Sequence, residues 1–186
     1  MFRTFARKLF VTAGAGARLN STAAASSSAG PVYDGFLGSL RADLKTCIRT
    51  KAPALEKTTV RGILSEMKNL EIENHGSVVD EFKIYDHLNK LVKQRKETAS
   101  EYLKPDQPER FKELAQNELD EAKIINKYLT ALPVASEDEI VAKLTELMKT
   151  ENITDKRKLF QKIPWGKINK EWRASKGAVS NAINNL

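Results

Sequence analysis

An arginine and a glutamate occupy positions where two predicted helices otherwise carry apolar residues. Arg95 lies in a stripe of apolar residues that repeats every three or four positions along residues 77–103, and Glu118 lies in a similar stripe along residues 109–132. A turn with two prolines, residues 105–108, joins these helices, so we expect them to fold back antiparallel. Reflection about that turn places Arg95 opposite Glu118.

The first interpretation of this pair is structural. A buried arginine and glutamate fix the register of a helical hairpin, because any slip leaves both charges unmatched, and truncating one partner costs about 3–5 kcal/mol. The same reflection pairs Tyr102 with Phe111 and turns Leu114 inward. In the alternative interpretation, Arg95 binds a phosphate or a substrate and Glu118 is solvated.

A basic stretch with interleaved aromatic residues, 156–176, is the second candidate. Its eight basic residues stand against Glu171 alone, which gives a net charge of +7. Basic side chains neutralise phosphates and exposed rings stack on bases, so the pattern favours RNA contact. The alternatives are a protein-binding surface for an acidic partner and a merely solvated face. The candidate contact residues are Lys162, Lys167, Lys170, Arg173 and Lys176, joined by Lys93 and Lys96 from the 77–103 helix and by the rings of Phe160, Trp165 and Trp172.

No catalytic constellation accompanies these residues. Cys47 is the single cysteine and falls on an apolar helical stripe with no histidine near it in the pattern, so we interpret it as a core residue. Glu118 and Glu121 are one helical turn apart, but two carboxylates without a histidine or a third acid make a weak metal site. We therefore predict no catalytic residue, no metal and no cofactor.

Helices must position these side chains, because apolar residues recur every three or four positions throughout the chain after Pro31 and no strand pattern appears. The expected fold is all-α, with an N-terminal antiparallel helical bundle over 32–132 and a smaller C-terminal three-helix bundle over 133–186. Ser77 is the expected cap of the third helix, and Ser136 begins a capping box at the start of the fifth.

The first 31 residues differ in composition from the rest. They carry four basic residues and no acid, begin with an amphipathic pattern and continue with alanine, serine and threonine. This composition is typical of a mitochondrial presequence followed by a linker, which predicts location in the mitochondrion, with the matrix as the expected compartment. A disordered basic tail is the alternative. No apolar run reaches the roughly 20 residues of a membrane span, so we expect no membrane insertion.

Four blocks of this sequence resemble the YqeY-like family, which is similar to the tail domain carried by one of the subunits of the Asp/Glu-tRNA amidotransferase. The resemblance runs from about Phe36 to Leu186. The blocks are VRGILSEMKNLEIE (60–73), KLVKQRKETASEY (90–102), NELDEAKIINKYL (117–129) and SKGAVSNAINNL (175–186). The family's marked positions fall on Arg61, on Lys93, Gln94, Arg95 and Thr98, and on Glu118 and Glu121.

Two departures from the family pattern affect the hinge and the C-terminal contact surface. Thr130 stands where the family usually has proline, and residues 172–177 replace a glycine-rich acidic turn. The resemblance implies carbon–nitrogen ligation with glutamine as the amide donor, in which the tail resembles a tRNA-contacting appendage. We expect a mitochondrial accessory that binds tRNA, or an amidotransferase or translation component, and does not catalyse. The alternative is a non-enzymatic protein-interaction adaptor. The oligomeric state stays open.

Overall fold

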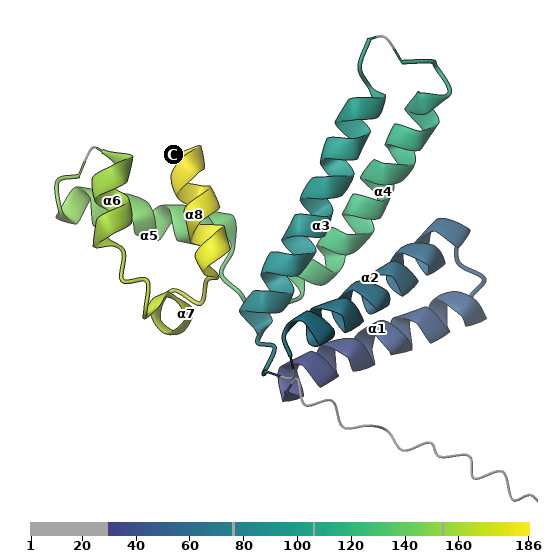
Figure 1. The fold of residues 1–186 in the computed structure, drawn as a ribbon, viewed down its shortest axis with the longest axis horizontal. Coiled ribbons are helices and arrows are strands. Elements are labelled where there is room, and N and C mark those ends of the chain that lie inside the picture. Colours follow the sequence, from purple (N-terminus) through teal and green to yellow (C-terminus); the bar gives the residue numbers. More distant parts are fainter. Residues whose placement is uncertain (1–29, 76, 106, 154) are drawn as a thin grey trace, which may run out of the picture.

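All regular structure in the described part of the chain is helical (Figure 1). The computed structural model describes residues 30–75, 77–105, 107–153 and 155–186. The predicted all-α class is confirmed, whereas the predicted presequence and linker, 1–31, lie outside the described residues except for Gly30 and Pro31. The helices are α1 (Pro31–Arg49), α2 (Ala54–Glu73), α3 (Glu81–Tyr102), α4 (Phe111–Thr130), α5 (Glu137–Thr150), α6 (Lys156–Lys162), α7 (Ile168–Glu171) and α8 (Lys176–Asn185).

Helices α1 to α4 enclose the first of two apolar clusters, here called the N-terminal core, whose buried residues run from Tyr33 to Leu132. Met67, Ile84 and Leu88 are fully buried in it. The Tyr33 hydroxyl donates a hydrogen bond of 2.7 Å to the Met67 carbonyl, so α1 is held to α2 by a satisfied polar contact inside an apolar interface. Helices α3 and α4 form the second hairpin of this group (Figure 1).

The start of α3 differs from the prediction. Asp80, and not Ser77, caps the helix, because its carboxylate accepts a hydrogen bond of 2.8 Å from the backbone N–H of Lys83. Val79 before the cap and Ile84 in the first turn are both fully buried in the N-terminal core. This arrangement is a hydrophobic staple, which fixes the angle at which the chain enters the helix. Burial of Val79 thus places the cap three residues after Ser77.

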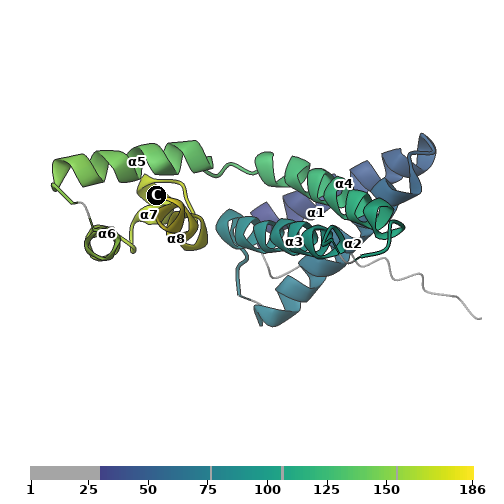
Figure 2. The ribbon, with the colours of Figure 1, turned by 90° about the horizontal axis from the view of Figure 1, so that it is seen from above.

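Helices α5 to α8 enclose the C-terminal core, whose buried residues run from Ala135 to Ile183. The predicted capping box starts α5: Ser136 accepts from the N–H of Glu139, and the Glu139 carboxylate accepts from the N–H of Ser136. The group contains the one-turn helix α7 after Pro164, so the described chain has four helices here, where the sequence predicts three. Figure 2 shows the two helical groups side by side.

Three contacts join the two groups. Tyr85 of α3 packs against both cores. The Ser175 hydroxyl, at the start of α8, donates a hydrogen bond to the carboxylate of Asp86 on α3. At the linker, the Arg173 guanidinium donates to the Pro133 carbonyl at 3.0 Å.

Candidate nucleic-acid interface

Arg95 lies between two carboxylates of α4. One terminal nitrogen is 3.0 Å from the nearer oxygen of Glu118, and the other is 3.2 Å from the nearer oxygen of Glu121. The structure therefore brings the predicted partners together and adds Glu121, one helical turn further along. At the turn end of the same hairpin, the rings of Tyr102 and Phe111 are 5.4 Å apart, which agrees with the predicted register.

The arginine is less buried than the sequence predicts. Its side chain keeps 43% of its surface exposed, while the two carboxylates keep 19% and 17%. Solvent screens part of the attraction, so losing this group should cost less than losing a buried pair. The predicted inward position of Leu114 is wrong, since Leu114 is exposed and its neighbour Ala115 is buried.

A groove of about 640 Å³ between α2, α3 and α4 collects several residues of the family pattern. Gln94, Arg95, Thr98 and Glu121 all line it. The arginine is already shared between two carboxylates, and Glu66 adds a third at the same groove. A phosphate here would meet surplus negative charge, so the geometry favours the structural interpretation of Arg95 over an anion site.

The predicted C-terminal contact residues are all exposed, but they differ in their partners. Lys162 is 3.0 Å from Glu151, and Lys167 is 3.7 Å from Glu171. Such surface pairs are weak and exchange readily for a phosphate. Among the described residues, no acid lies within ion-pair distance of Lys170 or Lys176. Arg173 is part of the linker contact with Pro133, and its backbone is left-handed, with φ of 51°.

The aromatic residues of the basic stretch are only partly available. Trp165 and Trp172 are partly buried and pack against the C-terminal core. The Trp165 indole N–H donates to the Phe160 carbonyl at 2.8 Å, and the two rings lie 4.5 Å apart. Phe160 itself is 46% exposed, so it is the ring of the three that is most open to stacking.

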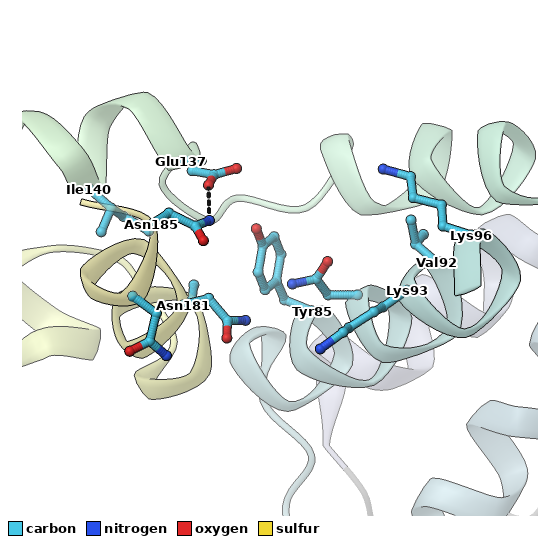
Figure 3. A pocket seen from close by; sticks show the side chains of 11 residues that line it. Tyr85, Val92, Lys93, Lys96, Glu137, Ile140, Asn181 and Asn185 are labelled. Atoms are coloured by element: carbon cyan, nitrogen blue, oxygen red, sulfur yellow. Dashed lines mark hydrogen bonds between the residues drawn. The ribbon is translucent and has the colours of Figure 1, made fainter. Parts of the chain in front are cut away.

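Lys93 and Lys96 are exposed on α3, where they face a second hollow, lined also by α5 and α8 (Figure 3). The block Lys-Gln-Arg is thus divided, because Lys93 lines this cleft while Gln94 and Arg95 line the groove behind it. The carboxamides on the opposite wall have no signal in the sequence. Asparagine carries no charge and no helical preference that marks it, so only the fold reveals that these side chains converge.

Cys47 is buried, and burial, followed by the nearby Glu56 carboxylate, raises the pKa of its thiol, which disfavours the nucleophilic thiolate. In the described ranges, no three His, Cys, Asp or Glu side chains come together to hold a metal ion. None of the described helices combines the length and apolarity needed to cross a membrane.

Comparisons with known proteins agree with the resemblance found in the sequence. The family described as Yqey-like protein matches residues 38–185. A protein of Komagataella phaffii named "Altered inheritance of mitochondria protein 41, mitochondrial" is 44% identical, with 98% of this chain and 94% of the relative covered. Proteins of the same name from Kluyveromyces lactis (38% identical, 81% of each chain) and Saccharomyces cerevisiae (35%, 82% of this chain and 83% of the relative) are also similar.

Proposed function

This chain is a member of the YqeY-like family, and from that premise we propose that it is a tRNA-binding accessory of glutamine-dependent amidation that does not catalyse the reaction itself. Its relatives are named as mitochondrial proteins, and the chain is mitochondrial like them. The matrix is the proposed compartment, because mitochondrial tRNA is located there together with the enzymes that amidate the amino acid attached to it.

The observation that carries the proposal is the concentration of exposed positive charge on the C-terminal helices. Residues 156–176 hold eight of the ten basic residues between 133 and 186, with a single acid among them. Neutralising phosphates releases counterions, which supplies affinity without sequence readout. A folded RNA such as tRNA presents closely spaced phosphates, which exposed basic side chains close together in the chain can neutralise.

The proposed accessory role is supported by the absence of an activated nucleophile among the residues that the structure describes. Releasing ammonia from glutamine requires one, and the buried Cys47 has a raised thiol pKa. We expect the pure protein, supplied with glutamine, ATP and Glu-tRNA, to produce no Gln-tRNA. Turnover by the pure protein would contradict the accessory role and leave RNA binding untouched.

The decisive experiment measures tRNA affinity by fluorescence anisotropy over a range of salt concentrations. Reversing charge at Lys162, Lys167 and Lys170 to glutamate should weaken binding at least about tenfold and reduce the slope of log affinity against log salt by about 2–3.

The matched control applies the same charge change to another exposed basic group, at the end of α1. Reversing Lys45, Arg49 and Lys51 to glutamate alters the net charge equally, so it should leave affinity within about twofold of the unaltered chain. Equal losses in the two variants would show that only net charge matters, and unchanged tRNA binding in the first would refute this surface.

The alternative function, a protein-interaction adaptor, has one observation in its favour. Ile72, at the end of α2, and Val78, before α3, are large apolar residues with 71% and 63% of their surface exposed. Apolar side chains this exposed at the two ends of one connection are where we would look for a protein contact. Capture from mitochondria followed by ribonuclease separates the two functions, because a protein partner held at Ile72 and Val78 stays bound and an RNA-bridged partner is lost.

A further inference from the structure

The cleft between the two helical groups differs from the basic surface in its chemistry. It has a volume of about 450 Å³, within the range of roughly 300–1,000 Å³ that small-molecule sites occupy. One wall is α3, and the other is formed by α5 and α8 (Figure 3). Its lining is dominated by polar side chains that carry both hydrogen-bond donors and acceptors.

Four asparagine side chains converge on this cleft. Asn89 comes from α3, and Asn181, Asn184 and Asn185 come from α8. Asn185 donates to the Glu137 carboxylate at 3.3 Å, as the dashed line in Figure 3 marks. Within the described part of the chain, the other three carboxamides have no hydrogen-bond partner. A carboxamide offers a donor pair and an acceptor in one plane, which matches the edge of a nucleobase.

A ring and a carboxylate complete the inner part of the cleft. Tyr85 is half-buried between the walls, so its position is fixed by both cores before any ligand arrives. Burial, followed by the Glu137 and Asp86 carboxylates, raises the pKa of the Tyr85 phenol, which therefore remains a neutral hydrogen-bond donor at physiological pH. Glu137 can accept from the exocyclic amine of a base.

The rim of the cleft supplies positive charge. Lys93 and Lys96 are one helical turn apart on α3, and Figure 3 shows both side chains extending toward the C-terminal helices. Lys93 has only a loose contact of 3.8 Å with Glu97, and Lys96 has no acid within ion-pair distance among the described residues. Two exposed ammonium groups, only one of which has an acidic partner in the described ranges, line one edge of a polar cleft and suit a phosphodiester that passes over that edge.

We propose that this cleft binds one unpaired nucleotide of an RNA, with its base among the asparagines and Tyr85 and its phosphate on Lys93 and Lys96. The inference rests on the proposed RNA-binding function and adds a recognition site to it. The basic surface of 156–176 holds the folded body of the RNA by charge, and the cleft selects a single-stranded end or a flipped-out base.

The test compares two RNA hairpins that differ only in a three-nucleotide single-stranded 3′ extension. The unaltered chain should bind the extended hairpin about tenfold more tightly than the blunt one. In the double variant Asn89→Ala and Asn181→Ala, that ratio should fall to about one while affinity for the blunt hairpin is kept. Both positions are helical and alanine favours helix, so the variant should fold.

The matched control is Asn117→Ala with Asn126→Ala, two exposed asparagines of α4, and the tenfold ratio should survive there. The reversal of Lys162, Lys167 and Lys170 should weaken both hairpins and preserve the ratio. A ratio of one in the unaltered chain, or a ratio kept in the cleft variant, overturns the cleft while leaving RNA binding intact. If neither hairpin binds the unaltered chain, the proposed function and the cleft are overturned together.

A direct readout identifies the occupant. Adding adenosine or cytidine 5′-monophosphate should shift the side-chain amide NMR signals of Asn89 and Asn181, whereas inorganic phosphate alone should leave them in place. Shifts caused by inorganic phosphate alone would show that the cleft recognises the charge of the phosphate and not the base. If an extended acidic peptide shifts these signals and the nucleotides do not, the ligand of the cleft is a protein segment and not a nucleotide.

Discussion

The two helical groups use their charged residues in different ways. Residues 32–132 carry seventeen basic and seventeen acidic side chains, and the arginine at the centre of the α3–α4 hairpin is shared between Glu118 and Glu121. Residues 156–176 concentrate basic side chains on a small group of helices and leave them exposed. In the first group charge aligns helices, whereas in the second it is available to a partner. Within the family's Lys-Gln-Arg block, Arg95 therefore makes a contact between helices, whereas Lys93 faces the cleft.

The largest expected effect concerns the independence of the two cores. Leu88 and Leu144 are fully buried, one in each core, so replacing either by alanine should cost about 3–5 kcal/mol of unfolding free energy. Hydrogen exchange should show that Leu144→Ala loosens residues 135–186 and leaves the other helices protected.

The exposed Leu114 is the control for this pair, since its replacement by alanine should change stability by less than about 1 kcal/mol. Loss of protection across both groups in Leu144→Ala would show that they unfold as one unit. The two groups would then be two surfaces of a single cooperative structure.

The next effect tests whether charge aligns the hairpin. Arg95→Ala leaves two partly buried carboxylates one turn apart, so it should cost about 1–3 kcal/mol, measured by urea unfolding. Combined with Glu118→Gln, the loss should be smaller than the sum of the two single losses.

Lys93→Ala serves as the control, because its contact with Glu97 is exposed and should contribute nothing measurable. Additive losses of unfolding free energy for Arg95 and Glu118 would mean that the two side chains do not interact in solution. Charge would then not align the helices of the N-terminal group.

A smaller effect compares two glycines. At Gly62, in the middle of α2, an added Cβ meets nothing within 4 Å, so Gly62→Ala should stabilise by about 0.5–1 kcal/mol. A Cβ at Gly177 would lie 2.8 Å from the Asp86 carboxylate, which must shift, so the gain in helix propensity should be offset and Gly177→Ala should stabilise less than Gly62→Ala. Equal rises in the temperature of unfolding for the two variants would contradict the close contact between α3 and α8.

The smallest effect is the pH dependence of that contact. Burial raises the pKa of Asp86, the hydrogen bond from Ser175 partly opposes the shift, and Asp80 adds to it. A raised pKa means that the folded chain binds this proton more tightly than the unfolded chain. The contribution of Asp86 to stability is therefore fully present below its ordinary pKa of 3.8 and is lost as pH rises through the raised value.

Comparison with Asp86→Asn isolates this term, because asparagine keeps an acceptor for Ser175 and does not titrate. The stability of the unaltered chain relative to the variant should decrease as pH rises from about 3.5 toward neutrality. A difference between the two that stays constant over this interval would rule out a penalty from burying the Asp86 charge.

Much of the fold follows from sequence because helix faces are set by local periodicity. The all-α class, the capping box at Ser136 and the core position of Cys47 depend only on neighbours within a few residues. The encounter of Arg95 with Glu118 follows from the symmetry of a hairpin about its turn. The wrong predictions concern tertiary packing. Each residue turns a helix by about 100°, so a slight rotation of α4 buries Ala115 in place of Leu114.

The cleft could not be predicted because the contact that brings α3 to α8, between Asp86 and Ser175, spans 89 residues of the chain. Its geometry depends on how Ser175 meets Asp86 and how Tyr85 packs against both cores. No periodic signal encodes such a contact, and asparagines on exposed helix faces are ordinary. Lys93 and Lys96 could be predicted from their charge, whereas the asparagines beside them carry none.

The hydrogen bond of 3.0 Å from the Tyr128 hydroxyl to the Asp43 carboxylate has a consequence for biogenesis. It ties α1 to α4 across 85 residues, and the N-terminal core is closed only when Leu132 is in place. A polypeptide that enters an organelle amino end first must therefore deliver about a hundred residues before this core is complete. Until then the apolar faces of α1 and α2 stay exposed, so we expect an organellar chaperone to bind them.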